Sequence, residues 1–256
     1  MDPAVRCYLA DLVSTARDVL GPDLVGAYAA GSVALDAYQP GRSDVDVALV
    51  CRSGLAEEAK RELVGRLRHE ALPCPARGLE LVAYSRAVAG SGTPEPGFEV
   101  ELNTGARMPF RATLTPSARP AADGHFWYGL DRSILHQRGH RLLGPPAAEV
   151  FADLSPDDLR RLLVTALRWW RDRPTPAGDE PAPGAEDAVL GACRALVRVR
   201  DGEWLSKVAA GRRVVASGRD PDLVGRCVAA RRGGPAPGAA EARDFQLRVL
   251  DEIAAG

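Results

Sequence analysis

Short apolar runs alternate with amphipathic stretches over the first half of the chain. Apolar residues recur at helical spacing between Val5 and Leu20, after an Asp2-Pro3 pair that suits a helix start, and Gly21-Pro22 ends the pattern. Bounded apolar runs then predict four strands, over residues 24–30, 45–51, 79–84 and 98–102. Strands that alternate with helical patterns indicate a domain of the α/β class.

Two more helices and a link complete this half. A charged stretch over 55–71 places Leu63 and Leu67 on one face, which predicts a helix, and another helix is predicted over 130–141. The segment 91–97, with the sequence Ser-Gly-Thr-Pro-Glu-Pro-Gly, predicts a flexible link between the third and fourth strands.

The second half of the chain shows helical patterns alone. Ser155-Pro156 followed by two acidic residues is a strong helix start. Apolar stripes predict four helices: one from Ser155, one over 189–197, one from Asp220-Pro221 and one over 245–253. A loop rich in Pro and Gly, 173–184, follows the first of them. The pattern predicts a sheet-containing domain over 1–152 and a helical domain over 153–256, with a cleft between them where a substrate could lie.

A Gly-Ser turn and an Asp-x-Asp pair are the residues most informative about chemistry. Gly31-Ser32 follows the first predicted strand, and Asp44 and Asp46 open the second. Side chains alternate along a strand, so both carboxylates point the same way and repel each other unless a cation lies between them. Mg²⁺ takes hard oxygen ligands and keeps positions open for phosphate oxygens, while the turn offers N–H groups and a hydroxyl to a polyphosphate. Together these residues predict nucleotidyl transfer.

The spacing of these residues resembles the nucleotidyltransferase superfamily that includes polymerase beta. Over most of its length the chain is also similar to the aminoglycoside adenylyltransferases that modify streptomycin and spectinomycin. The further motifs that carry this likeness are Leu79-Glu80-Leu81, Gly144-Pro145 with Ala147-Ala148-Glu149-Val150-Phe151, Val189-Leu190, Arg194, and Gly202 followed by Ser206-Lys207. The likeness implies a polymerase-beta-like domain with a mixed sheet, followed by a helical bundle. It also implies transfer of AMP from ATP to a hydroxyl of the antibiotic, with magnesium and release of pyrophosphate.

The likeness gives the matching positions of the first domain distinct roles. Gly31-Ser32 would hold the triphosphate, and Asp44 and Asp46 would bind magnesium. By the likeness, Glu80 matches the family's catalytic base. A carboxylate within reach of the acceptor hydroxyl can take its proton during attack on the α-phosphate. Burial would raise the pKa of Glu80 and magnesium would lower it. Glu101, on the next strand, is the alternative base.

Two cations of the helical domain are assigned to the same nucleotide. Arg194 lies on the polar side of its predicted helix and Lys207 follows thirteen residues later. The likeness implies that both reach the ATP phosphates, arginine as a planar bidentate group and lysine as a compact charge. The chain contains only two lysines, which favours a specific role for Lys207. Nucleotide binding would then draw the two domains together and exclude water.

The acceptor-selecting positions differ from those of streptomycin-modifying members. Where those carry a Trp after the fourth strand, this chain has Ala-Arg-Met around Arg107, and where they carry an Asp it has Gly184. Glu186 and Asp187 lie next to that glycine, in an acidic region that would suit a polycation. We therefore take Arg107, Glu186 and Asp187 as candidate acceptor-binding residues. We expect a small polycationic or aminocyclitol acceptor ahead of streptomycin.

Composition narrows the remaining choices. Lys plus Arg (33) nearly balance Asp plus Glu (34), and a net charge of −1 argues against a nucleic-acid partner. Five scattered cysteines form no Cys-x-x-Cys pair, which indicates a reducing compartment and neither a disulfide frame nor a zinc site. No run approaches the roughly 20 apolar residues of a membrane span, and no secretory signal is visible. We therefore expect a cytoplasmic monomer that has no membrane partner.

Two alternative functions stay open. One is a nucleotidyltransferase whose acceptor is a protein side chain or an RNA end, although the balanced charge disfavours RNA. The other is a catalytically silent nucleotide-binding protein, which the joint presence of two metal aspartates and a candidate base disfavours.

Overall fold

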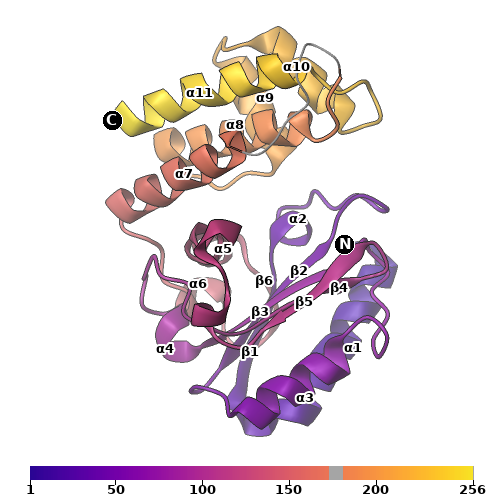
Figure 1. Ribbon diagram of the computed structural model, residues 1–256. Coiled ribbons are helices and arrows are strands. Elements are labelled where there is room, and N and C mark those ends of the chain that lie inside the picture. The colour runs from indigo at the N-terminus through magenta and orange to yellow at the C-terminus, as the bar shows by residue number, and fades with distance from the viewer. Residues whose placement is uncertain (173–180, 256) are drawn as a thin grey trace. The chain divides into compact units, whose positions relative to one another are not determined.

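The computed structural model describes residues 1–172 and 181–255, and the chain forms two compact units, Met1–Ser155 and Pro156–Gly256. The first unit contains a sheet and the second contains helices (Figure 1). No helix in the described ranges is long and apolar enough to cross a membrane.

The sheet of the first unit is mixed, as predicted. Its described strands are β1 (Leu24–Ala29), β2 (Val45–Cys51), β3 (Leu79–Ser85), β4 (Phe98–Gly105), β5 (Met108–Thr113) and β6 (His140–Leu143). They lie in the order β5-β4-β3-β2-β1-β6, and β2 pairs in parallel with β3 while every other pair is antiparallel. The two central strands are therefore β2 and β3, which carry Asp46 and Glu80.

Helices cover both faces of this sheet. Helices α1 (Pro3–Leu20) and α3 (Glu57–Leu67) lie side by side on one face, where Leu12 and Leu63 pack against Leu49 of β2 in a fully buried cluster (Figure 1). The other face buries Tyr28 and Tyr84 against Tyr128 of α5 (Phe126–Arg138). The short helices of this unit are α2 (Gly31–Ala34), α4 (Arg86–Ala89) and α6 (Ala147–Val150), with 3-10 turns at Gly21–Asp23, Pro116–Ala118 and Ala121–Asp123.

The second unit is built around one central helix. Its described helices are α7 (Pro156–Arg171), α8 (Ala185–Asp201), α9 (Lys207–Ala216), α10 (Pro221–Ala230) and α11 (Ala239–Ala255). Helix α8 contacts all the others, and Val189, Leu190 and Cys193 on it are fully buried. The predicted stripes of α7, α8, α10 and α11 are therefore confirmed as helices.

Three secondary-structure predictions were wrong or incomplete. The helix predicted over 130–141 begins at Phe126 and ends at Arg138, because the chain then enters β6. The edge strand β5 of the first unit was not predicted. Helix α9 was not predicted either, so the second unit has more helices than the four expected.

The predicted flexible link over 91–97 is held in place by a buried side chain. The guanidinium of Arg132, only 2% exposed, donates to the carbonyl oxygens of Thr93, Glu95 and Pro96 at 2.6–2.8 Å. Of the predicted loop over 173–184, residues 173–180 lie outside the described residues.

Candidate active site

The Gly-Ser turn lies directly against the second aspartate of the Asp-x-Asp pair. Gly31 begins α2 with φ +50°, and the N–H of Ala30 donates to the carbonyl oxygen of Asp46 at 2.9 Å. A Cβ at residue 31 would overlap the Asp46 carboxylate, at 2.5 Å from its Cγ. Both the backbone angle and the close approach therefore require glycine at this position.

The hydroxyl of Ser32 is available to a ligand. Its Oγ is buried and has no hydrogen-bond partner within the described parts of the chain. A buried hydroxyl of this kind costs free energy unless a partner is supplied. A phosphate oxygen at the turn would supply one.

Replacing Gly31 tests how tightly the turn and the carboxylate are fitted. We expect Gly31→Ala to lower turnover by about a hundredfold, because the new methyl group displaces Asp46 and misplacement of about 1 Å has such an effect. Gly41→Ala is the matched control, since Gly41 also has a positive φ (+78°) but its Cβ would meet nothing within 4 Å. The control should lose only the roughly 1–2 kcal/mol of backbone strain in stability. Steady-state rates and melting curves of both variants measure the two effects; equal losses of turnover would contradict the assignment.

The predicted metal ligands and the predicted base come together at one end of the central strands. Asp44 immediately precedes β2, Asp46 lies in it, and Asp46 is the register partner of Glu80 on the parallel strand β3. Register partners share a sheet face, and neighbouring strands lie about 4.8 Å apart. The same face carries Tyr28 and Tyr84, so these carboxylates lie on the face that α5 covers.

The neighbours of Glu80 change its ionisation. Burial, followed by the negative charges of Asp44 and Asp131, raises the pKa of Glu80 to about 7, although Arg77 and Arg111 oppose the shift. Without a cation, the site therefore disfavours charging all its carboxylates together.

Glu101 has a different environment, although it lies on the same sheet face. Its Oε1 accepts from Arg111 at 3.0 Å and forms an ion pair with Arg119, and both side chains of the Arg119 pair are only 6% exposed. Its register partner on β3 is Val82, whereas the partner of Glu80 on β4 is Asn103. Glu101 is therefore committed to two arginines.

Several residues near the site were missed in the sequence analysis. Arg77 forms an ion pair with Asp44. The negative charge of Asp131, on α5, raises the pKa of Glu80. Neither belongs to a recognisable motif, since each is brought to the site only by the fold. A weak signal did exist for Asp131, because it falls at helical spacing between Tyr128 and Leu135, on the sheet-facing side of α5.

The acidic residues fit a magnesium ion whose coordination shell is completed by phosphate oxygens and water. Among the described residues, no group of three or more His, Cys, Asp or Glu side chains is gathered to hold a metal ion alone. Mg²⁺ characteristically binds one or two carboxylates together with substrate phosphates and water. Asp46 against the Gly31 turn, Asp44 two residues before it, and the unsatisfied hydroxyl of Ser32 match that requirement.

The predicted residues of the helical unit form contacts within that unit. Lys207 donates to Asp187 at 3.2 Å, and Arg194 lies over the ring of the buried Trp204 at 5.8 Å. Glu186 is 6% exposed and accepts from the N–H of Gly184, at the start of its own helix. Both acidic candidates for acceptor binding therefore already have partners.

Arg107, the remaining acceptor candidate, lies in the first unit. It is exposed in the turn between β4 and β5, where its N–H donates to the carbonyl oxygen of Arg77 at 3.3 Å. Arg107 therefore lies beside the backbone of Arg77, whose side chain pairs with Asp44. The sequence did not indicate this neighbourhood.

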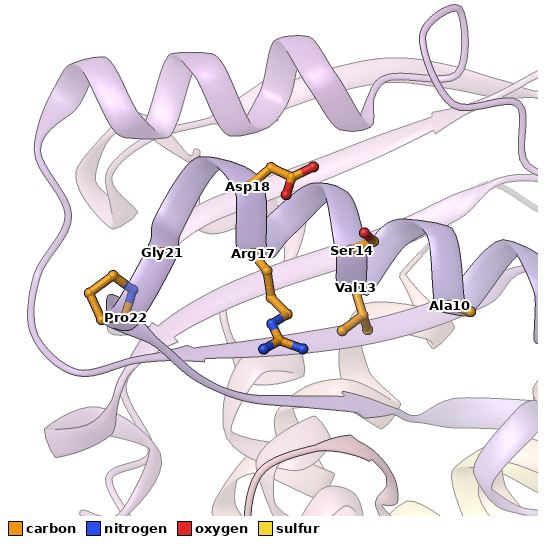
Figure 2. Close-up of a pocket in the computed structure, with 7 residues that line it drawn as sticks. All are labelled: Ala10, Val13, Ser14, Arg17, Asp18, Gly21 and Pro22. Carbon is orange, nitrogen blue, oxygen red and sulfur yellow. The ribbon is translucent and has the colours of Figure 1, made fainter.

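A surface hollow in the first unit is separate from these residues. Figure 2 shows that its lining comes from the outer side of α1 and the turn after it, including Arg17 and Asp18. Helix α1 covers the sheet face opposite the carboxylates. The hollow is therefore not the candidate active site.

A comparison with solved structures shows that the chain has the fold of a nucleotidyltransferase. The structure of the spectinomycin adenyltransferase AAD(9) from Enterococcus faecialis, solved with ATP and spectinomycin, matches with a TM-score of 0.66. The match covers 98% of this chain and 99% of that chain at 16% sequence identity. No protein-family model and no curated protein matches the sequence. The comparison confirms the predicted fold, and it confirms the predicted resemblance of this chain to adenylyltransferases of the spectinomycin-modifying type.

Proposed function

We propose that the protein transfers AMP from ATP to a hydroxyl of an aminoglycoside or aminocyclitol-like small molecule and releases pyrophosphate. The observation that carries the proposal is the fit of the Gly31 turn against Asp46, whose register partner is Glu80. The likeness of fold to an adenyltransferase solved with ATP and spectinomycin supports it. Protein and RNA acceptors have no comparable support.

The nucleotide would be held at the Gly31 end of the sheet. The turn and the Ser32 hydroxyl bind phosphate oxygens, and Asp44 and Asp46 hold magnesium. The ion, when bound, neutralises charge on the phosphates during transfer. The prediction that Arg194 and Lys207 bind the triphosphate, arginine as a planar bidentate group and lysine as a compact charge, is part of this proposal.

Glu80 is the proposed base. The acceptor oxygen attacks the α-phosphorus, the bond from that phosphorus to the pyrophosphate oxygen breaks, and the hydroxyl proton passes to the Glu80 carboxylate. The contacts of Glu101 with Arg111 and Arg119 support Glu80 over the alternative, because an acceptor would have to compete with two arginines for Glu101.

The acceptor is expected to be an aminocyclitol ahead of streptomycin. Streptomycin carries guanidinium groups, which bind best to a carboxylate through paired hydrogen bonds. Gly184 supplies none, and the nearby Glu186 and Asp187 are engaged within their own unit. The loss of one charged hydrogen-bond pair with a guanidinium group should weaken the binding of streptomycin about tenfold or more.

A panel assay tests both the reaction and the acceptor. Purified protein with labelled ATP and magnesium is assayed for pyrophosphate release against spectinomycin, streptomycin and other aminoglycosides. We expect turnover of spectinomycin-like acceptors at least about tenfold above that of streptomycin. Glu80→Gln is the control and should be inactive with every acceptor. Equal or faster turnover of streptomycin would overturn the acceptor assignment, and the absence of turnover with any small acceptor would overturn the proposed function.

A further inference from the structure

Arg77 lies in the segment before β3, and hydrogen bonds hold its backbone on two sides. Its N–H donates to the carbonyl oxygen of Ser43 at 3.2 Å, and its own carbonyl oxygen accepts from the N–H of Arg107 at 3.3 Å. A Cβ at Gly105 would lie only 2.6 Å from that carbonyl oxygen, so the turn between β4 and β5 packs closely against it. The backbone of Arg77 is therefore fixed beside Asp44, the residue that follows Ser43.

The side chain of Arg77 joins the acidic end of the central strands. Its guanidinium forms an ion pair with Oδ2 of Asp44, in which the arginine side chain is 45% exposed and that of the aspartate 22%. Burial lowers the pKa of Arg77, but its hydrogen bond with Asp44 and the charge of that carboxylate raise the pKa overall. The charges of Glu80 and Asp46 act in the same direction. Arg77 is thus close enough to all three carboxylates to act on each of them.

Asp44 is also one of the two proposed magnesium ligands, so the arginine and the metal ion would bind the same carboxylate. Mg²⁺ binds through one or two carboxylates, and a positive group next to them repels it. The pairing of Arg77 with Asp44 is therefore weakened or lost when the ion binds. Because the arginine side chain is long and half-exposed while its backbone is fixed, the guanidinium can leave Asp44 without a change of fold.

We propose that Arg77 is a built-in counter-cation of the metal site, which competes with a divalent cation for Asp44 and keeps the affinity of the site for the free ion low. A metal ion that arrives with a polyphosphate brings negative charge of its own, which offsets the repulsion by the arginine. The site would thus favour the metal–nucleotide complex over the free ion. Asp44 and Asp46 enter here as metal ligands, which rests on the proposed function.

Binding of Mn²⁺ without nucleotide measures this competition. Mn²⁺ takes the same oxygen ligands as Mg²⁺, and the electron paramagnetic resonance signal of the hydrated ion disappears as it binds. We expect Arg77→Gln to bind Mn²⁺ about fivefold more tightly than the wild type, as for the loss of a partly exposed charged pair. Arg77→Lys keeps the charge and should stay close to the wild type. Weaker binding in Arg77→Gln would mean that the arginine orients Asp44 for the metal, and unchanged binding that it does not compete; either result would overturn the proposal.

Arg111→Gln separates pairing with Asp44 from the general positive charge of the region. Arg111 is also close enough to the candidate base for its charge to act on it, and its side chain is similarly exposed (42%), but it pairs with Glu101. Glu101 keeps a second, buried arginine in this variant. Arg111→Gln should change the Mn²⁺ affinity by less than about twofold, because salt screens exposed charges that are not in contact. A tightening equal to that in Arg77→Gln would refute the specific role of Arg77.

The same titration with a non-hydrolysable ATP analogue tests the preference for the metal–nucleotide complex. With the analogue present, the gain in Mn²⁺ affinity in Arg77→Gln should fall below about twofold, since the phosphates offset the charge of the arginine in the wild type. An equal gain with and without the analogue would overturn this preference.

Further outcomes separate the role of Arg77 from the proposed function. Asp46→Asn, added to Arg77→Gln, should abolish Mn²⁺ binding; binding that survives it would place the ion elsewhere and overturn the proposal. Melting curves show whether each variant is folded, and Arg77→Met, which keeps the aliphatic stem, replaces Arg77→Gln if that variant unfolds. Mn²⁺ that binds only with the analogue, equally in the wild type and Arg77→Gln, would refute the role of Arg77 and leave the proposed function standing. No binding under any condition would overturn the proposed function itself.

Discussion

Asp46→Asn is expected to abolish nucleotidyl transfer while the protein stays folded. The substitution keeps the shape of the side chain but removes the charge that would hold magnesium against the Gly31 turn. Metal ions contribute several kcal/mol of transition-state stabilisation, and a loss of about 4 kcal/mol is roughly a thousandfold in rate. The measurement is the rate of pyrophosphate release at saturating magnesium, with a melting curve for the fold.

The control for this experiment removes a carboxylate of the same unit far from the site. Asp18 is exposed on α1, on the sheet face opposite the carboxylates. Asp18→Asn should keep wild-type turnover and stability. Normal turnover in Asp46→Asn would mean that Asp46 binds no essential metal ion.

The two candidate bases should give opposite results on substitution. We expect Glu101→Gln to destabilise the first unit by about 3–5 kcal/mol, because it leaves the buried guanidinium of Arg119 without its charged partner. Glu80→Gln should remove turnover with little loss of stability, because it removes a charge that burial already disfavours. Denaturant unfolding measures the first effect and pyrophosphate release the second.

A double variant and a surface control make the Glu101 result specific. Replacing both partners, Glu101→Met with Arg119→Leu, should recover much of the lost stability, since no unpaired buried charge remains. Glu57→Gln removes an exposed partner of Arg61 and should change stability by less than about 1 kcal/mol. A stable, inactive Glu101→Gln together with an active Glu80→Gln would reverse the assignment of the base.

The central elements could be predicted from the sequence because their signals are local. Each of the strands β1 to β4 is rich in apolar residues within one short segment, and Gly31, Asp44 and Asp46 lie close together in the sequence. The edge strands could not be predicted in this way. β5 contains a proline and is mostly exposed, and β6 follows α5 after one residue, so its pattern looked like a continuing helix.

The surroundings of the site could not be predicted for a related reason. Arg77 reaches Asp44 across 33 residues, and Arg119 reaches Glu101 across 18, without any periodicity that would link them. For Asp187 the sequence offered its acidic charge near Gly184, which suggested contact with a cationic acceptor and gave no indication of its partners within the fold. Only the packing of α8, α9 and α10 shows that its partners are Lys207 and Arg231.

The central position of β2 and β3 has a consequence for heating and for amide exchange. Both strands have hydrogen-bonded neighbours on each side and helices on each face, so their amides should exchange with solvent only when the whole unit unfolds. Asp46 and Glu80 are fixed to this slowest-exchanging part of the sheet. Their spacing should therefore persist until global melting, and activity on heating should disappear together with the protection of these amides.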